Sequence, residues 1–317
     1  MSLNGKVLVT GGAGFIGSHI VDALMEIRDV DEVVVIDDLS TGKALNIKHH
    51  IGSDRFRFVK GDICNRRVIH EVMKDANYVF HEAAMANVPL SLKDPHRCYE
   101  INVAGTLNLL EEARIQDSIF IYASSCAVYG NPKSLPLVED YPPRPISPYG
   151  ASKLSAEALC IAYNEAYGLK STCLRYFNVY GPRQAYSQYA GVITIFTNRA
   201  LRGEDLIIYG DGMQTRDFIY VKDIVEANLL AAECKDAYGK VFNVGTGKET
   251  SIIELALKIR EITGADVRII HKPPLKGDIR RSVADISRMK RIIGFTPRTS
   301  LEDGLSSFIK YVSSGLR

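Results

Sequence analysis

The sequence has few of the features that mark membrane, secreted or nucleic-acid-binding proteins. No apolar run among its 317 residues is long enough to span a bilayer, and the N-terminus lacks the basic and then apolar layout of a signal peptide. The 39 basic and 37 acidic side chains leave a formal net charge of only +2, which provides no general attraction for nucleic acid or a membrane surface. We therefore expect a protein that binds neither nucleic acid nor membrane.

Paired cysteines and clustered metal ligands are also missing. The six cysteines lie far apart, no Cys-x-x-C motif occurs, and only His49 and His50 stand side by side. Neither a disulfide framework nor a metal site is expected, and most of the cysteines are expected to be small buried hydrophobic residues. The histidine pair is expected in a solvated loop. Reduced thiols in a chain of this length suit a cytoplasmic protein.

What the sequence does contain is a regular alternation of short apolar runs with longer helical patterns. The apolar runs end at turn residues and predict strands at 7–10, 32–36, 56–59, 78–81 and 119–123. The patterns between them predict helices at 15–27, 66–74, 97–115 and 148–167. This order predicts the α/β class, with a doubly wound parallel sheet of the Rossmann type.

The rhythm changes after residue 178. A stretch rich in Gly, Pro, Gln and Tyr at 180–191 is expected to be loop, and helices are expected near 192–202, 222–235, 250–263 and 300–313. Strands are expected between them at 206–209, 241–244 and 267–270. We therefore predict a Rossmann domain at 1–178 and a smaller C-terminal α/β lobe at 179–317, with crossovers of the chain between the two.

A glycine-rich turn follows the first predicted strand. Gly12, Gly14 and Gly17 satisfy the pattern G-x-G-x-x-G, and Gly11 begins the alternative G-x-x-G-x-x-G. Glycines in this context let the backbone approach a pyrophosphate, and the following helix offers free N–H groups and the positive end of its dipole. Glycine-rich turns are common, so the pattern alone does not establish a dinucleotide site.

An acidic pair at the end of the second predicted strand strengthens the dinucleotide interpretation. Asp37 lies about 20 residues beyond Gly17, where dinucleotide-binding sequences place the carboxylate that binds a ribose. Asp38 follows with no arginine beside it, and two carboxylates would repel the 2′-phosphate of NADP. A solvated loop that merely begins with two acids is the alternative. The combined pattern predicts bound NAD.

A tyrosine and a lysine four residues apart open the helix predicted at 148–167. Tyr149 and Lys153 emerge on one face of that helix, and the ammonium is expected to lower the pKa of the phenol from its ordinary value near 10. Such a phenolate can take a proton from a sugar hydroxyl while hydride passes to NAD. The spacing is short enough that an incidental surface pair is the alternative.

Two hydroxyls end the fifth predicted strand. Ser124 and Ser125 stand at its carboxyl end, where a doubly wound sheet binds its ligands. A serine there can hydrogen-bond the reacting hydroxyl or the keto oxygen that forms from it. Helix capping is the alternative, but Val-Tyr-Gly and Asn-Pro follow the pair rather than a helix.

Together these residues resemble those of the extended short-chain dehydrogenases/reductases, and more narrowly those of the UDP-sugar 4-epimerases. The resemblance covers nearly the whole chain, through motifs at 10–17, 37–40, 61–62, 81–84, 102–106, 124–125, 149 with 153, 174–183 and 210–217. It implies NAD as the cofactor, a UDP-sugar as the substrate and a homodimer. The dimer is expected to form through the helices at 97–115 and 148–167, with apolar surface from Leu107, Leu110, Leu154, Leu159 and Ile161.

The resemblance also implies roles for individual residues. The catalytic residues are expected to be Tyr149, Lys153 and Ser125, with Ser124 as the second choice for the hydroxyl. The cofactor is expected to contact Gly11, Gly14, Phe15, Ile16, Gly17, Asp37, Asp38, Ser40, Asp62, Ile63, Ala83, Ala84, Asn102, Tyr149, Lys153 and Tyr176. The nucleotide sugar is expected to contact Asn178, Val192, Ile193, Arg216, Asp278 and Ser282.

One departure from the family pattern concerns the residues that bind the diphosphate of the nucleotide sugar. Family members often have an arginine three residues before the acid of a Gly-Asp or Gly-Glu pair, and this chain has Leu275 there. Either Arg280, Arg281 or Lys276 takes its place, or the grip on the second phosphate is weaker.

The resemblance implies epimerisation at C4 of the hexose through a 4-keto sugar that rotates before the hydride returns. Ser282 stands at the family's gate beside the hexose 2-position, and its small size implies that N-acetylated sugars enter alongside UDP-glucose and UDP-galactose. Pro89 replaces an arginine typical of uronate epimerases, and Cys126-Ala127 replaces the acids of dehydratases. UDP-glucuronate epimerisation or decarboxylation, and a sensor that binds NAD without catalysis, are the alternatives.

Overall fold

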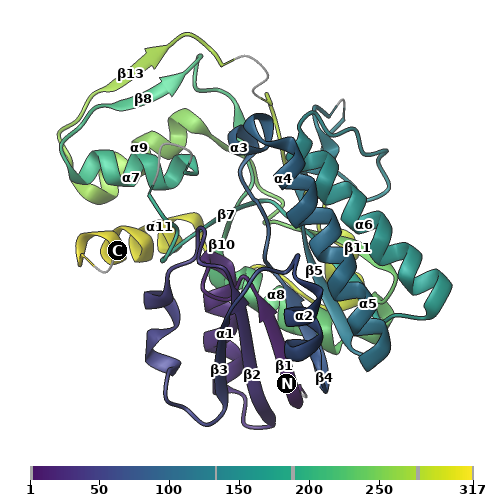
Figure 1. Cartoon of the computed structure of the whole chain (residues 1–317). Helices are drawn as coiled ribbons and strands as arrows, with labels where there is room; N and C mark the ends of the chain where they lie inside the picture. Colours follow the sequence, from purple (N-terminus) through teal and green to yellow (C-terminus); the bar gives the residue numbers. More distant parts are fainter. Residues whose placement is uncertain (1–2, 133, 187–189, 276–278, 316–317) are drawn as a thin grey trace.

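A seven-stranded parallel sheet forms the centre of the molecule (Figure 1). The computed structural model describes residues 3–132, 134–186, 190–275 and 279–315. The strand order is β11-β6-β5-β4-β1-β2-β3, so the winding reverses between β1 and β4. The strands are β1 (Gly5–Thr10), β2 (Val30–Asp37), β3 (Phe56–Lys60), β4 (Ala76–His81), β5 (Ile119–Ser125), β6 (Ser171–Tyr176) and β11 (Lys240–Val244). The predicted doubly wound α/β fold is confirmed.

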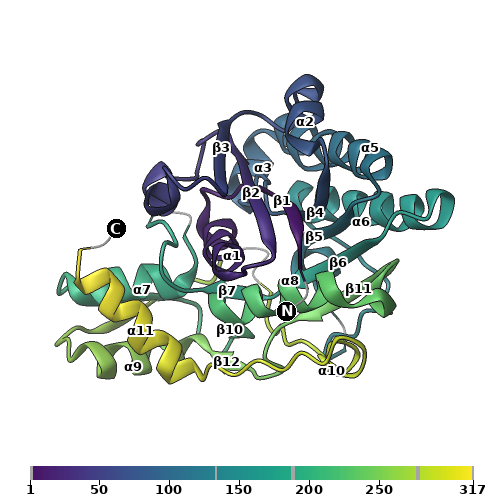
Figure 2. The ribbon, with the colours of Figure 1, turned by 90° about the horizontal axis from the view of Figure 1, so that it is seen from below.

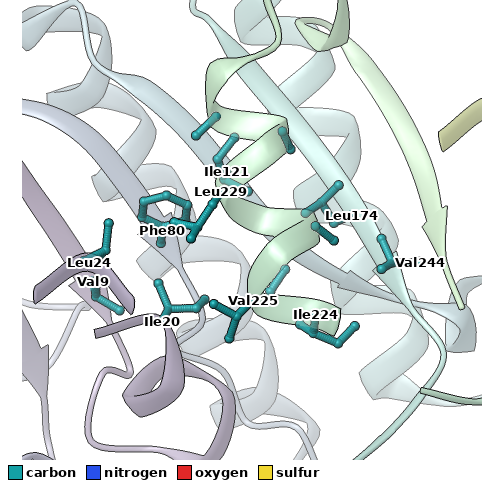
Figure 3. Close-up of a cluster of buried hydrophobic side chains, with 14 of the residues drawn as sticks. Val9, Ile20, Leu24, Phe80, Ile121, Leu174, Ile224, Val225, Leu229 and Val244 are labelled. Carbon is teal, nitrogen blue, oxygen red and sulfur yellow. The ribbon is translucent and has the colours of Figure 1, made fainter. Parts of the chain in front are cut away.

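The strands are apolar on both faces because helices cover both faces of the sheet. Along β1, Val7 and Val9 join one apolar core, whereas Leu8 joins the core on the opposite side. In the first core, Leu229 and Ile224 pack toward the sheet beside strand residues (Figure 3). The helices of this face are α1 (Phe15–Glu26) and α8 (Val221–Glu233), and those of the other are α2 (Arg66–Met73), α5 (Thr106–Gln116) and α6 (Pro148–Tyr167).

A smaller lobe lies beyond the carboxyl edge of the sheet (Figures 1 and 2). Its third apolar core is built from the helices α7 (Val192–Leu201), α9 (Ile252–Thr263) and α11 (Leu301–Ser313) beside the parallel strands β8 (Leu206–Tyr209) and β13 (Ile269–Lys272). Short strand pairs connect the two parts, namely β7 (Asn178–Tyr180) with β10 (Phe218–Tyr220), and β9 (Thr215–Arg216) with β12 (Thr250–Ser251). The chain crosses between the parts after residue 178, because α8 and β11 return to the large sheet.

The helix predicted at 97–115 is present, and a π-helical turn lies inside it. The chain forms α3 (Val88–Lys93), α4 (Pro95–Tyr99) and then a π-helical turn η2 (Glu100–Gly105) before α5. Two local contacts accompany the turn. Thr106 donates from its hydroxyl to the carbonyl of Asn102 at 2.7 Å, and a Cβ on Gly105 would lie only 2.7 Å from Cδ1 of Ile63. π-helical turns are rare and frequently mark functional sites.

The histidine pair also differs from expectation, because it ends the 3-10 helix η1 (Ala44–His50) rather than lying in a loop. Nε2 of His49 and Nε2 of His50 each lie 2.8 Å from Oδ1 of Asp22, and Nη2 of Arg183 lies 2.7 Å from Oδ2. The ligand atoms of the Asp22, His49 and His50 cluster lie within 4.8 Å of one another. Both carboxylate oxygens are already engaged, and the positive charge of the Arg183 guanidinium opposes a bound cation.

Half of the six cysteines are buried, whereas the sequence predicts that most of them are. All six cysteines are free, with Cys98, Cys160 and Cys173 buried. The remaining short helices are η3 (Cys126–Tyr129), η4 (Lys235–Ala237) and α10 (Ser287–Ile293). Among the described residues, no helix has both the length and the apolar character that crossing a membrane requires.

A buried ion pair fastens α6 to the sheet. Glu157 of α6 and Arg175 of β6 are 1% and 4% exposed. Nη2 and Nε of the guanidinium donate to the carboxylate at 2.8 and 3.0 Å, and Nη1 donates to the carbonyl of Glu139 at 3.1 Å. Ser124 donates its hydroxyl to Glu157 as well. Each buried charge is therefore paired, which is the condition under which such charges are tolerated.

Removing one member of this pair should be more harmful than removing both. We expect Glu157→Leu to lower the free energy of unfolding by about 3–5 kcal/mol, because it leaves the Arg175 guanidinium buried without its partner. The double variant Glu157→Leu/Arg175→Met should recover part of that loss. Urea unfolding followed by circular dichroism measures both. A double variant less stable than Glu157→Leu would contradict this interpretation.

Candidate active site

The glycine-rich turn brings two strand ends together. Gly11 adopts a φ of 66°, and a Cβ there would lie 2.7 Å from the amide nitrogen of Ala83, closer than any side chain is tolerated. A Cβ on Gly17 would lie 2.3 Å from the carbonyl oxygen of Gly11. Gly14 is the N-cap of α1 and provides no side-chain cap, and the first turn of α1 contains no acidic residue. The free N–H groups and the positive end of α1 are therefore available to an anionic ligand.

A groove of about 480 Å³ runs across the carboxyl ends of β3, β2, β1 and β4. Twelve of the residues predicted to contact the cofactor line it, namely Gly11, Gly14, Phe15, Ile16, Gly17, Asp37, Asp38, Ser40, Asp62, Ile63, Ala83 and Ala84. The other four, Asn102, Tyr149, Lys153 and Tyr176, are not among its lining residues. This edge of a doubly wound sheet, where the strand order reverses, is where such folds bind nucleotides.

The acidic pair divides into a buried and an exposed member. Asp37 is 8% exposed and accepts hydrogen bonds from the amides of Ala13 at 3.0 Å and Leu39 at 2.8 Å. Burial raises the pKa of Asp37, against the lowering effect of those two amides. Asp38 is exposed, and its Oδ1 accepts from the amide and the hydroxyl of Ser40. Asp37 therefore orders the glycine turn as well as facing the groove.

Sequence reasoning gave no role to two charged residues of the groove, Arg97 and Glu82. Nη2 of Arg97 lies 2.7 Å from Oδ2 of Asp62. Although burial acts in the opposite direction, this hydrogen bond holds the pKa of Asp62 below its usual value. Nothing in the sequence pairs Arg97 with a residue 35 positions earlier. Glu82 stands inside a recognised motif, which located the segment without indicating what its carboxylate contacts.

Asn102 lies behind the groove and holds the segment that follows β4. Its Oδ1 accepts from the amide of Met85 at 2.8 Å, and its Nδ2 donates to the hydroxyl of Ser152 at 2.9 Å. Asn102 is 1% exposed and belongs to the π-helical turn. The geometry gives Asn102 a supporting position between α6 and the segment after β4.

Tyr149 and Lys153 project from the first two turns of α6. Ser147 caps this helix by accepting from the amide of Gly150 at 3.1 Å, and Pro148 occupies its first position. The Lys153 ammonium donates to the carbonyl of Ala123 at 2.7 Å and lies 4.9 Å from the ring centre of Tyr122. Lys153 is 3% exposed, and Tyr149 is half-buried.

The pKa of Tyr149 is opposite to the sequence expectation. Burial raises it to about 12, although the Ser125 hydroxyl acts to lower it. Burial likewise lowers the pKa of Lys153 to about 8, with Glu82 acting in the opposite direction. Desolvation of the phenol therefore outweighs the effect expected of a lysine one turn away.

The structure separates the two serines at the end of β5. Ser124 is 3% exposed and donates to Glu157, so its hydroxyl is part of the buried ion-pair cluster. Ser125 is partly exposed, accepts from the amide of Ala127 at 3.1 Å and lies close enough to Tyr149 to influence its pKa. The geometry favours Ser125 as the hydroxyl that would meet a reacting group.

Tyr176 joins the groove to the opposite face of the sheet. It is 6% exposed, and its hydroxyl lies 2.8 Å from Oε1 of Glu82 and 2.9 Å from Oδ1 of Asn228. Nδ2 of Asn228 lies 2.7 Å from the same hydroxyl and donates to it. This chain of side chains links β4, β6 and α8 beside the groove.

The residues predicted to contact the nucleotide sugar are spread over the junction of the two parts. Asn178 of β7 donates from Nδ2 to the carbonyl of Asp217 at 3.0 Å, and Arg216 of β9 donates to the carbonyl of Ile279 at 2.7 Å. Ile193 is only 2% exposed and belongs to the core of the smaller lobe, with Val192 packed against that core. Ser282 is 6% exposed. Asp278 and Lys276 lie outside the described residues.

A second cavity, of about 670 Å³, lies beside β8 and β13 and is lined by Leu275 and Arg280. Of the two described candidates for the missing arginine, only Arg280 lines it. Arg280 forms a bidentate ion pair with Asp211, with Nη1 2.7 Å from Oδ1 and Nη2 2.8 Å from Oδ2. Nε of Arg281 lies 2.9 Å from Oε1 of Glu249. Both guanidiniums are exposed and already paired with carboxylates.

Comparisons with known proteins agree with this geometry. Residues 7–245 match the NAD dependent epimerase/dehydratase family. The chain is 42% identical to a UDP-glucose 4-epimerase of Thermotoga maritima solved with UDP-glucose, over 98% of this chain and 100% of that one, with a TM-score of 0.92. It is 41% identical to a UDP-N-acetylglucosamine 4-epimerase of Methanobrevibacter ruminantium solved with UDP-N-acetylmuramic acid. That match covers 98% of this chain and 99% of the other, with a TM-score of 0.93. A UDP-glucuronic acid 4-epimerase of Bacillus cereus, solved with UDP-glucuronic acid and NAD, is 35% identical to this chain. The match covers 98% of this chain and 99% of the other, with a TM-score of 0.91.

The buried acid of the pair should matter more for cofactor binding than the exposed one. We expect Asp37→Ala to weaken NAD binding by roughly tenfold or more, because it removes the carboxylate expected to accept from the ribose and leaves the amides of Ala13 and Leu39 without their partner. Asp38→Ala, which removes an exposed carboxylate, is the matched control and should change the affinity by less than about threefold. Isothermal titration with NAD measures both. Equal effects of the two substitutions would contradict the assignment.

Proposed function

Because this chain belongs to the NAD dependent epimerase/dehydratase family and, within it, to the UDP-sugar 4-epimerases, we propose that it inverts C4 of UDP-hexoses. NAD is its cofactor. The substrates we propose are UDP-glucose with UDP-galactose and UDP-GlcNAc with UDP-GalNAc. One observation carries the proposal: Tyr149 and Lys153 lie on one face of α6, with Ser125 next to Tyr149, at the carboxyl edge of the sheet that carries the NAD groove.

The groove fits a dinucleotide. The close approach at Gly11 and the uncapped N-terminus of α1 would receive the pyrophosphate, and Asp37 would receive the adenine ribose. Ala83 and Ala84 line the groove beside Glu82, which accepts from Tyr176, and would face the nicotinamide half. When bound, NAD supplies the hydride acceptor and donor of the reaction.

Side chains of α6 and β5 would accept and return the proton of the sugar 4-hydroxyl. The phenol of Tyr149 would take the proton of the sugar 4-hydroxyl, and Ser125 would hydrogen-bond the same oxygen. With a pKa of about 12, Tyr149 is protonated in the protein alone. A cationic ring and the Lys153 ammonium would have to offset the burial that raises this pKa. Lys153, with a pKa of about 8, is mainly charged at neutral pH.

Replacing the phenol tests this assignment directly. We expect Tyr149→Phe to lower kcat at least about a hundredfold, because general acid–base catalysis by a positioned side chain is worth that much, while NAD stays bound. Ser124→Ala, which alters the buried serine, should lower kcat far less than Ser125→Ala. The measurement is the rate of UDP-galactose conversion in a coupled assay, with bound NAD quantified in each variant. Near-wild-type turnover by Tyr149→Phe would refute the role of the tyrosine.

Sugar preference is proposed to depend on the space at Ser282. Ser282 is 6% exposed and lies in the segment that pairs with Leu137 through Ala284, and its small side chain would leave room for an N-acetyl group. We expect Ser282→Tyr to lower kcat/KM for UDP-GalNAc by more than about tenfold while UDP-galactose is still converted, because overfilling a pocket excludes the larger ligand. Ser282→Ala is the control and should retain both activities. Loss of both activities, or of neither, in Ser282→Tyr would refute the gate.

Product analysis with five nucleotide sugars separates the remaining alternatives. UDP-glucose, UDP-galactose, UDP-GlcNAc, UDP-GalNAc and UDP-glucuronate are incubated with the same protein under matched conditions. Interconversion of the first four supports the proposed substrates. Turnover of UDP-glucuronate alone would replace this proposal by uronate chemistry, and no turnover of any would favour a sensor that binds NAD without catalysis.

We further propose that the chain forms a homodimer through α5 and α6. Ile115 and Tyr167 near the ends of these helices are 60% and 58% exposed, and the two helices pack side by side. Leu110, expected at the interface, is instead fully buried in the core, while Leu159 and Ile161 are partly buried against that core. The contact surface would therefore be built from the exposed residues of these helices.

A further inference from the structure

Glu82 places a carboxylate in the groove close to both proposed catalytic residues. It follows the last residue of β4, lines the groove and is half-buried. Its amide donates to the carbonyl of Thr10 at 3.2 Å, so its backbone is tied to the end of β1. Its Oε1 accepts from the hydroxyl of Tyr176 at 2.8 Å. The carboxylate is thus held where the groove meets Tyr176, which lies behind the lining residues.

Among the described groups that face Glu82, the ammonium of Lys153 is the one positive charge that acts on its carboxylate. The titratable groups that face it are Lys153 and Tyr149 of α6 and Tyr176 of β6, and the neutral amide of Asn228 on α8 lies behind Tyr176. The Lys153 ammonium is already bound to the carbonyl of Ala123. Burial raises the pKa of Glu82 to about 7, although Tyr176 and Lys153 act to lower it. A cation placed beside this carboxylate would therefore be strongly favoured.

We propose that Glu82 sets the charge preference of the nicotinamide site, so that its carboxylate favours the cationic oxidised ring of NAD over the neutral reduced ring of NADH. This inference rests on the proposed function, because it takes the nicotinamide half of the cofactor to lie between Glu82 and Tyr149. It assigns to Glu82 an electrostatic role that is separate from holding Tyr176. The two roles predict different behaviour, because a structural role affects both redox forms equally.

The preference suits a reaction that must return its hydride. In an epimerase that keeps its cofactor, the sugar oxidised at C4 has to recover the hydride before it escapes. A carboxylate that disfavours the neutral ring relative to the cationic ring makes the return of hydride to the sugar more favourable. Glu82 would thus limit the accumulation of inactive protein that retains NADH.

The test is a competition between the two redox forms in the full-length protein. The protein is equilibrated with NAD and NADH at fixed ratios at pH 8, free nucleotide is removed by rapid filtration, and the reduced fraction of the bound nucleotide is measured by absorbance. We expect Glu82→Gln to shift the bound ratio toward NADH by about tenfold, because the amide keeps an acceptor for Tyr176 but removes the charge. Asn228→Ala, which disturbs the same tyrosine without changing charge, is the matched control and should leave the ratio within about twofold.

The wild-type protein provides a second measurement that needs no substitution. Protonation removes the charge of Glu82, so the preference for NAD should be present above pH 7 and lost as the pH falls below the pKa of about 7. At pH 6 the wild-type ratio should approach that of Glu82→Gln measured at the same pH, a comparison that cancels the titration of Lys153, whose pKa is about 8 in the wild type. An unchanged ratio in Glu82→Gln, or an equal shift in Asn228→Ala, would overturn the proposal.

The competition involves no sugar, so its failure is distinguishable from failure of the proposed function. If Glu82→Gln binds both forms as the wild type does, the charge preference is refuted while the epimerase proposal stands. If the wild type converts no UDP-sugar yet shows the expected shift, the epimerase proposal is refuted while the role of Glu82 stands. Absence of any bound nucleotide in the wild type would overturn both.

Discussion

The backbone at Gly11 passes so close to the backbone at Ala83 that no side chain fits between them, and the site depends on this approach. It forces the chain to turn sharply from β1 into α1, which leaves the N-terminus of α1 open to the groove. It also places the segment after β4 against the turn, where Glu82 and Ala83 form a wall of the groove. The proposed pyrophosphate and nicotinamide sites therefore share one covalent constraint, the absence of a Cβ at a single position.

Helix α6, which carries Tyr149 and Lys153, has a fixed position for a different reason. Residues along its buried face are each satisfied by the sheet, including Lys153 by the carbonyl of Ala123 and Glu157 by Arg175. Because buried charges without partners are costly, α6 has one well-defined position relative to β5 and β6. Tyr149 is thereby held at the carboxyl edge of the sheet by contacts that lie up to two turns away from it. Preorganisation of this kind places a reacting group without dependence on a flexible loop.

Burial also determines the electrostatics of the site before any ligand enters. The neutral forms of Tyr149 and Lys153 are both favoured by desolvation, so the protein alone opposes the phenolate that the chemistry needs. Glu82 adds a carboxylate whose ionisation is balanced near neutral pH. A cationic ligand would shift these equilibria together, because each group lies within electrostatic reach of the others. This coupling could not be foreseen from the four-residue spacing of Tyr149 and Lys153, which suggested a lowered phenol pKa.

Local patterns in the sequence determined the fold class, the glycine turn, Asp37 and the placement of Tyr149 and Lys153 on one helix face, because each depends on neighbours within a few residues. Strands that are apolar on both faces, such as the one containing Val7, Leu8 and Val9, predict a sheet covered on both faces. The two apolar cores confirm this prediction. Only the tertiary structure decided that the helix contains a π-helical turn at Asn102 and that Arg97 binds Asp62. It also decided that Ser124 hydrogen-bonds the buried Glu157 while Ser125 lies beside Tyr149. It likewise brought Glu82 to Tyr176, 94 positions later. These contacts join strands and helices that are far apart in the chain. The pKa values of the side chains involved depend on burial, which cannot be inferred from the spacing of residues in the sequence.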